Sequence, residues 1–149
     1  MRFFCPRCWS DFPDDVPSCP TCGLDIPAFW RGKDYVGKLI AALQHPETET
    51  VIRAASILGD LHEEAAAKDL IELLAATSNV YVACAAAIAL GKIGTPQARE
   101  FLASVCRDHP AIMVRDTARA WAEIKPENIP CRDKDSTSKA VPGEKARRR

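Results

Sequence analysis

The residues best suited to chemistry are four cysteines arranged in two close pairs near the N-terminus. Two residues separate Cys5 from Cys8, two separate Cys19 from Cys22, and ten lie between the pairs. A C-x-x-C turn directs two thiolates at one ion, so two such turns supply the four soft ligands of a tetrahedral zinc site. The spacing therefore predicts one zinc ion held by these four residues. Because four protein ligands leave no open position for a water molecule, we expect the ion to be structural rather than catalytic.

The same thiols are also typical of two other kinds of site, an iron centre and a redox pair. Iron is the less favoured metal, since four thiolates also bind iron. A thioredoxin-type redox pair is expected in a βαβ context, whereas here a second C-x-x-C pair follows the first. Pro20 stiffens its turn and Gly23 permits a positive φ after the last cysteine, which allows backbone N–H groups to point at sulfur. Both residues favour metal binding.

The segments Cys5-Pro6-Arg7-Cys8 and Cys19-Pro20-Thr21-Cys22-Gly23 resemble the knuckles of zinc ribbons and rubredoxin-like sites, over about residues 3–26. The resemblance implies short β-hairpins carrying the two turns, with apolar cover from Phe3, Phe4, Trp9 and Phe12. So short a segment buries too little surface to order itself, so we expect zinc binding and folding to be one event. We predict a zinc ribbon over residues 1–28 and a linker over residues 29–33, with Phe29-Trp30 packing the ribbon on the next domain.

Elsewhere the sequence offers no set of residues typical of catalysis. His45, His62 and His109 fall in predicted turns without a cysteine or carboxylate at ligand or triad spacing, so we interpret them as surface residues. Cys84 and Cys106 occupy positions expected to pack in a helical core. We therefore predict no enzymatic activity, no catalytic residues and no organic cofactor.

The elements behind the cysteines are predicted to be helical and repetitive. Similar segments recur at offsets of 31 or 32 residues: residues 38–43 match 69–74, and residues 54–61 match 86–93. Each repeat combines two helical segments, and paired alanines let the helices approach closely. One helix pair cannot cover its own apolar face, so neighbouring pairs must stack to build a core.

Local signals set the ends of the six predicted helices. Asp34, Asn79 and Thr95 are suitable N-caps, and Pro96 suits the first helical position after Thr95. His45-Pro46 ends the first helix, and Lys125-Pro126 ends the last. Two glycines, Gly59 and Gly91, are predicted to stand where helices stop.

The Leu58-Gly59 and Leu90-Gly91 endings resemble those of HEAT repeats, of the short type found in phycobilisome bilin-lyase subunits and many other prokaryotic proteins. We therefore predict a mainly α fold, an α-solenoid of about three HEAT-like helix pairs over residues 34–125. The pairs are predicted at residues 34–60, 61–92 and 93–125. The resemblance implies a surface that binds a protein partner.

Charge and hydropathy limit the possible partners. The chain has 20 basic and 20 acidic residues, so no overall field favours nucleic acid or an anionic membrane. Residues 73–91 carry no formal charge, but a polar Thr77-Ser78-Asn79 turn divides them, so we interpret them as two helices of a soluble protein. Met1-Arg2-Phe3-Phe4 does not resemble a secretory signal, and we expect a cytoplasmic location. Residues 126–149 are predicted to be a disordered basic tail.

These features favour a zinc-binding HEAT-repeat protein that acts as a non-enzymatic adaptor or scaffold for an unknown protein partner. Nucleic-acid binding through the ribbon is the alternative, although the ribbon segment is net acidic. A bilin-lyase-like enzyme subunit ranks last, because only the family resemblance suggests it. We interpret Arg53, Arg115 and Arg119 as solvated helix residues rather than as a site for an acidic partner.

Overall fold

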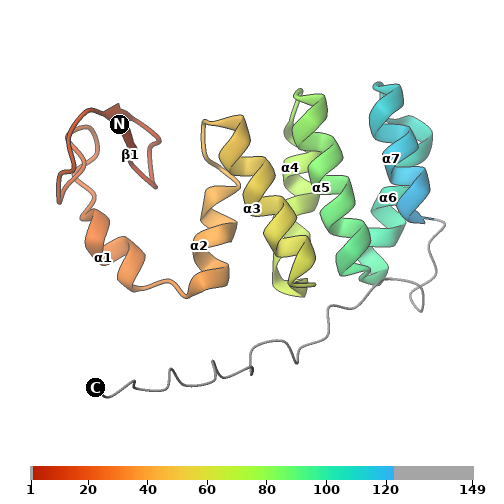
Figure 1. The fold of residues 1–149 in the computed structure, drawn as a ribbon, viewed down its shortest axis with the longest axis horizontal. Helices are drawn as coiled ribbons and strands as arrows, with labels where there is room; N and C mark the ends of the chain where they lie inside the picture. Colours follow the sequence, from red (N-terminus) through yellow and green to blue (C-terminus); the bar gives the residue numbers. More distant parts are fainter. Residues whose placement is uncertain (1, 123–149) are drawn as a thin grey trace, which may run out of the picture.

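The computed structural model describes residues 2–122 and consists of a small N-terminal module followed by a stack of helices (Figure 1). The module begins with two short strands and ends with a short helix: β1 (Phe3–Phe4), β2 (Asp11–Phe12) and α1 (Ile26–Arg31). The stack contains α2 (Tyr35–Ala42), α3 (Thr48–Asp60), the short 3-10 helix η1 (Glu64–Ala66), α4 (Ala67–Ala76), α5 (Val80–Ile93), α6 (Pro96–Asp108) and α7 (Ile112–Ala122). The predicted mainly α fold is confirmed.

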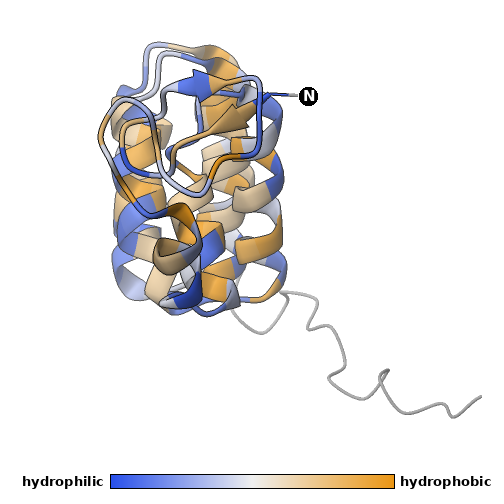
Figure 2. Cartoon of the chain, turned by 90° about the vertical axis from the view of Figure 1, so that its left-hand side faces the viewer, coloured by the Kyte–Doolittle hydropathy of each residue, from blue (hydrophilic) through white to orange (hydrophobic). Residues whose placement is uncertain are grey.

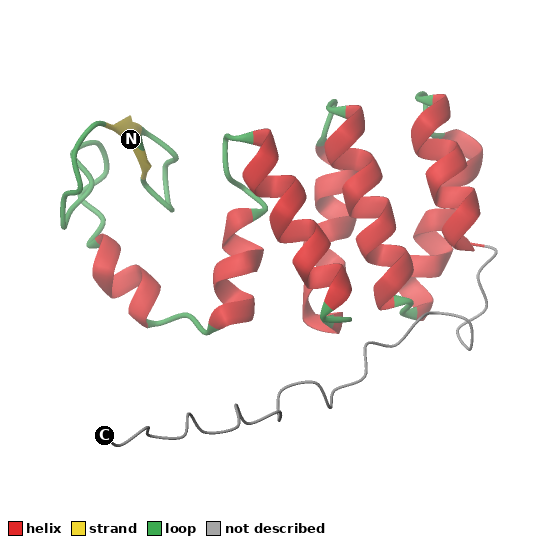
Figure 3. Ribbon diagram, viewed as in Figure 1, coloured by secondary structure: helices red, strands yellow, loops and turns green. Residues whose placement is uncertain are grey.

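The stack is built of three helix pairs arranged in two layers. The first helices of the pairs, α2, α4 and α6, form one layer, and the second helices, α3, α5 and α7, form the other (Figures 1 and 3). Neighbouring second helices pack closely on each other, α3 on α5 and α5 on α7, whereas α4 and α6 make far fewer contacts. We call α3, α5 and α7 the second-helix layer. The three predicted repeats are thus three stacked pairs that share one core.

Side-chain caps explain where several of these helices begin. The carboxylate of Asp34 accepts a hydrogen bond from the backbone N–H of Gly37 at 2.7 Å, and Asn79 Oδ1 accepts from Tyr81 N–H at 3.0 Å. Thr95 Oγ1 accepts from Ala98 N–H at 3.2 Å. Each bond satisfies a backbone donor that the first turn of a helix leaves unpaired. All three predicted N-caps are therefore confirmed.

The core of the stack is made of leucine and alanine. Six leucines are almost completely buried, and alanines fill the positions where helices cross: Leu43, Leu58, Leu70, Leu74, Leu90 and Leu102, with Ala55, Ala66, Ala83, Ala86, Ala87, Ala89, Ala98 and Ala118. Alanine brings the helix axes close together, and leucine then fills the remaining space between them. Cys84 and Cys106 are partly buried against this core, as predicted.

Gly59 and Gly91 do not end their helices, so this prediction was wrong. Both lie inside them, and α5 ends instead at Ile93, with Gly94 as its C-cap; the φ of 69° at Gly94 is the left-handed conformation that favours glycine. The two glycines serve packing. A Cβ at Gly59 would lie 2.8 Å from the Cα of Ala89, and a Cβ at Gly91 would lie 2.5 Å from Cγ of Trp121. Each glycine therefore allows one helix of the second-helix layer to approach the next.

A short helix occupies part of the segment predicted to link the module to the stack. Helix α1 starts before residue 28 and extends into the predicted linker of residues 29–33, because Asp25 caps it through a hydrogen bond from Ala28 N–H at 2.8 Å. The predicted disordered tail, residues 126–149, lies outside the described residues. None of the helices between residues 2 and 122 is long and apolar enough to cross a membrane.

Candidate metal centre

The four predicted ligand cysteines lie together at one point of the N-terminal module. Their sulfur atoms all lie within 4.8 Å of one another, with Cys5 and Cys22 3.6 Å apart and Cys8 and Cys19 3.7 Å apart. In a tetrahedral site with zinc–sulfur bonds of about 2.3 Å, sulfur atoms are separated by about 3.8 Å. The distances are therefore those that a single ion bound by four thiolates requires.

Two backbone turns of the same design carry these cysteines. In the first turn, Cys5 N–H donates to the carbonyl of Ser10 and Trp9 N–H donates to the carbonyl of Cys5, both at 3.0 Å. In the second, Cys19 N–H donates to Leu24 and Gly23 N–H donates to Cys19, both at 2.9 Å. The second turn thus repeats the first at an offset of 14 residues, from Cys5 to Cys19. We call these turns the first and second knuckles.

Short antiparallel pairings close both knuckles. In the first, β1 pairs with β2, and Phe4 lies opposite Asp11. In the second, the equivalent pairing is an isolated bridge between Ser18 and Asp25. The resemblance to zinc ribbons implied short hairpins, and the structure has one two-stranded hairpin and one bridge at these places. Each pairing fixes the two chain segments that enter and leave a pair of thiols.

Trp9 and Gly23 occupy equivalent positions in the two knuckles, and both have a left-handed backbone. Their φ values are 58° and 69°. Glycine adopts this conformation without penalty, whereas a residue with a Cβ loses about 1–2 kcal/mol there. The backbone of Trp9 is therefore strained, whereas a glycine would adopt the same conformation without penalty. We expect favourable contacts of the Trp9 side chain to compensate for this strain.

Backbone N–H groups and neighbouring thiols set the charge states of the cysteines. The side chain and backbone N–H of Ser10 bond to Cys8 and lower its pKa to about 6. Burial opposes ionisation of Cys19, but backbone N–H groups of Cys22 and Thr21 outweigh it and lower the pKa. The N–H of Leu24 has the same effect on Cys22, yet burial and the three other cysteines prevail and raise its pKa to about 12.

A cation at the centre of the cluster would allow all four cysteines to be thiolates at the same time. Burial and the neighbouring thiols together raise the pKa of Cys22, so the four cysteines do not all ionise readily within 4.8 Å of one another. A divalent cation stabilises all four thiolates at once, and the Arg7 N–H, 3.4 Å from Cys5 Sγ, adds a hydrogen bond that orients a ligand. The donor set suits soft, tetrahedral coordination, with every position filled by protein.

A small apolar cluster supports the metal centre. Phe12 and the sulfur-bearing residues Cys5 and Cys19 are buried, and Phe3 stacks on Phe12 with ring centroids 6.5 Å apart. The cluster has few members, and it is separate from the leucine–alanine core of the stack. So small a cluster cannot hold the module on its own, which agrees with metal-dependent folding.

Among the residues that the structure describes, the aromatic ring contacts between module and stack lie at the first knuckle, and none of them involves Phe29 or Trp30. Those two aromatic rings contact each other, with centroids 5.0 Å apart. Instead, Phe4 and Trp9 pack edge-on against His45, which lies in the turn between α2 and α3. Viewed from the N-terminal side, the module lies over the end of the helical stack (Figure 2). The pattern of aromatic residues in the sequence alone could not show which aromatic side chains of the module contact the stack.

The three histidines lie in turns, as predicted, but two of them share a structural role. His45 Nδ1 accepts a hydrogen bond from Glu47 N–H at 3.0 Å, and His109 Nδ1 accepts from Ala111 N–H at 3.1 Å. Thr77 does the same through Oγ1 with Asn79 N–H at 3.2 Å. A polar side chain thus closes the turn in each of the three helix pairs.

An exposed apolar surface lies on the second-helix layer, and the sequence analysis did not identify it. Tyr81, at the start of α5, is 68% exposed, while Ile112 and Met113, at the start of α7, are 67% and 45% exposed. We call these residues the apolar surface. A signal was available, since the same positions of the first repeat carry the polar residues Thr48 and Glu49.

The arginines of α3 and α7 are bonded to nearby residues of the chain. Arg53 contacts Glu49 and Arg119 contacts Asp116, each at 3.1 Å. Arg115 donates to the backbone carbonyls of His109 and Pro110, at 2.6 and 3.0 Å. The three arginines therefore form no shared basic site, in agreement with their interpretation from the sequence.

A family model described as HEAT repeats matches residues 36–122. The matched residues include all three helix pairs and begin after the four cysteines. No curated protein and no solved structure matches the chain.

Proposed function

The chain belongs to the HEAT-repeat family, and from this we propose that it is a zinc-binding, non-enzymatic adaptor that holds a partner protein on its second-helix layer. HEAT repeats are scaffolds whose stacked helices present an extended surface. The observation that carries the proposal is the apolar surface, where Tyr81, Ile112 and Met113 expose large side chains at the ends of two adjacent helices. Such a surface costs free energy in water unless another molecule covers it.

The partner is an apolar stretch of a protein rather than a highly charged molecule. Arg53 and Arg119 are paired with acids of the same helix, and Arg115 is bonded to two backbone carbonyls, so these arginines offer no shared site for phosphates. Aromatic and methionine side chains are typical anchors of protein–protein contacts. Salt-sensitive binding to nucleic acid, with no protein partner, would contradict the proposal.

Zinc is the metal we assign to the four cysteines. The support comes from the four thiolate donors and from their separations of 3.6 and 3.7 Å. Because all coordination positions are filled by protein, the ion supplies structure and no activated water. Its role in the adaptor is to hold the N-terminal module in shape at the end of the stack.

A crosslinking experiment tests the adaptor function. A photoreactive amino acid replaces Tyr81 in one variant and Tyr35 in another, and both chains are expressed in the native cell. Tyr35 is the matched control, because it is also a tyrosine in the first turn of a helix and is 61% exposed, but it lies on α2. We expect one protein to be crosslinked from position 81 and not from position 35.

The crosslinked protein must then bind the purified chain through the same residues. Tyr81→Asp should weaken this binding at least tenfold, a loss of about 1.4 kcal/mol, whereas Tyr35→Asp should leave it unchanged. Both substitutions place an acid in the first turn of a helix, where it is favourable, so neither is expected to unfold the chain. Equal effects of the two variants would refute the assignment of the surface.

A further inference from the structure

Three aromatic rings join the metal-binding module to the first repeat. The ring centroid of His45 lies 4.7 Å from that of Phe4 and 5.3 Å from that of Trp9, at interplanar angles of 70° and 71°. Both are edge-on arrangements, which are the favourable geometry for aromatic pairs at these distances. We call Phe4, Trp9 and His45 the ring cluster.

The ring cluster is attached directly to the metal ligands. Phe4 immediately precedes Cys5, and Trp9 immediately follows Cys8. The positions of both rings therefore depend on the backbone of the first knuckle. Because the same backbone must bring Cys5 and Cys8 to one ion, metal coordination and ring placement are two consequences of one conformation.

The strained backbone of Trp9 indicates that contacts of its ring stabilise this conformation. The equivalent position of the second knuckle is Gly23, which forms the same hydrogen-bonded turn without a side chain. A tryptophan adopts a left-handed conformation only where its surroundings enforce it. The surroundings here are the metal ligands on one side and His45 on the other.

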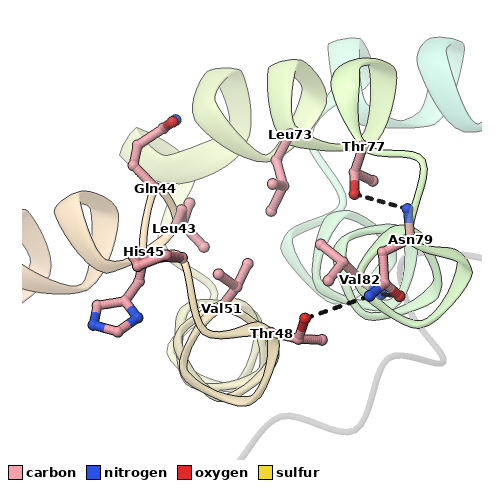
Figure 4. A pocket seen from close by; sticks show the side chains of 10 residues that line it. Leu43, Gln44, His45, Thr48, Val51, Leu73, Thr77, Asn79 and Val82 are labelled. Carbon is pink, nitrogen blue, oxygen red and sulfur yellow. Dashed lines mark hydrogen bonds between the residues drawn. The ribbon is translucent and has the colours of Figure 1, made fainter. Parts of the chain in front are cut away.

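His45 is oriented to receive the two rings. Its Nδ1 accepts the Glu47 N–H, which fixes the plane of the imidazole. Figure 4 shows this ring pointing away from the side chains of Leu43 and Val51, which line the pocket beside it. Thr77 closes the equivalent turn of the second repeat with a hydroxyl, so the turn itself does not require an aromatic ring.

We propose that metal binding controls the docking of the N-terminal module on the repeats, and that the ring cluster is the contact that responds. With the four cysteines bound to zinc, the first knuckle holds Trp9 and Phe4 against His45. Without zinc, the two-residue strands and the few buried residues of the module do not enforce the strained Trp9 conformation, and the rings leave His45. This inference rests on the metal binding in the proposed function and adds a means of regulating it.

Metal binding would therefore control the shape of the N-terminal end of the adaptor. In the docked state the module lies over the end of the stack, with Phe4 and Trp9 against the turn between α2 and α3 (Figure 2). In the undocked state the first repeat loses its cover. Zinc availability would therefore change the surface presented to a partner.

Fluorine NMR of the full chain labelled with 5-fluorotryptophan tests the proposal. The chain contains three tryptophans, and the Trp9 resonance is assigned by its absence from Trp9→Phe. Spectra are recorded for zinc-loaded chain and for chain stripped with a strong chelator in reducing buffer. His45→Asn removes the ring while its side-chain oxygen can still close the turn.

His109→Asn is the matched control, since His109 makes the same hydrogen bond to the residue two positions on. None of the aromatic ring contacts found within residues 2–122 involves it. In the zinc-loaded chain we expect the Trp9 resonance to shift with His45→Asn and to stay unchanged with His109→Asn. In the stripped chain, wild type and His45→Asn should give the same Trp9 resonance.

Two results would overturn the proposal. If the Trp9 resonance of the zinc-loaded chain does not shift with His45→Asn, the rings do not dock as described. If the stripped chain keeps its sensitivity to His45→Asn, docking does not depend on metal. Elemental analysis of the same samples separates these failures from a failure of the proposed function, because a chain that takes up no zinc refutes metal binding itself.

Trp9→Gly supplies a second, independent test. This substitution copies Gly23, so it relieves the strain in the first knuckle and removes the ring from His45 at the same time. We expect zinc to bind at least as tightly as in the wild type, while trypsin cleaves after Lys33, between module and stack, several times faster. Unchanged cleavage with full zinc binding would show that Trp9 does not hold the module in place.

Discussion

At the scale of single residues, four thiols define what the N-terminal module can do. Their separations suit one tetrahedral ion, and the raised pKa of Cys22 shows that the cluster is unfavourable as four free thiolates. The same residues make up much of the buried interior of the module, since Cys5 and Cys19 are 0% and 2% exposed. We therefore expect metal binding and folding of the module to be coupled through the same atoms.

Replacing one ligand should abolish metal binding. We expect the wild type to contain about one zinc ion per chain, and Cys19→Ser to contain none after dialysis, because a buried hydroxyl is a poor substitute for a soft thiolate. Elemental analysis of purified protein measures both. Cys84→Ser is the control, since this partly buried cysteine of α5 lies in the stack, and it should retain the zinc. Equal zinc content in the two variants would contradict the site.

At the scale of elements, small residues and caps decide how the helices meet and where they begin. Ala89 and Gly59 bring the backbones of α3 and α5 close together, and Gly91 of α5 leaves room for the side chain of Trp121 on α7. The caps fix the starts of the helices, so that their apolar faces meet in register. Two stability predictions follow from particular contacts.

Gly59→Ala should destabilise the stack. The added methyl group would lie 2.8 Å from the Cα of Ala89, so α3 and α5 would have to separate, with a loss of about 1–3 kcal/mol in the free energy of unfolding. Urea unfolding followed by circular dichroism measures the change. Gly32→Ala is the control, because the nearest atoms there are 3.8 and 3.9 Å away. A loss of stability as large in the control would refute the close-packing explanation.

Asn79→Ala should destabilise the stack by about 1 kcal/mol, through loss of the cap of α5. Asn79 Oδ1 accepts from Tyr81 N–H and Val82 N–H at 3.0 and 3.4 Å, and Asn79 Nδ2 donates to Thr48 Oγ1 at 3.4 Å. Thermal unfolding monitors the effect. Asn79→Asp keeps the capping oxygen and should retain most of the stability; a loss as large as that of the alanine variant would show that the cap is not the cause.

At the scale of the whole molecule, the protein has two interiors of different character. The stack is held by a continuous leucine–alanine core, whereas the module depends on a few residues around the four thiols. The ring cluster of Phe4, Trp9 and His45 is the aromatic contact between them. The two parts should therefore respond differently to loss of the metal.

Removing zinc should unfold the module and leave the stack helical. A strong chelator in reducing buffer is expected to change the far-ultraviolet circular dichroism at 222 nm only slightly, because α2 to α7 hold nearly all of the described helix and share the other core. Proteolysis of the same sample should then cut within residues 2–31 first. Loss of most of the helical signal on chelation would mean that the stack depends on the metal as well.

The helix pairs, three of their N-caps and the four clustered cysteines could be predicted from the amino-acid pattern. These features depend on local spacing: a 32-residue period, a capping side chain beside its helix, and two C-x-x-C turns. Only the tertiary structure decided which residues meet across elements. It placed Trp9 against the first repeat, put Gly59 and Gly91 where neighbouring helices meet, and left Tyr81, Ile112 and Met113 exposed at the starts of two adjacent helices. The physical reason is that such contacts depend on how whole helices and turns are oriented toward one another, which no local pattern of residues records.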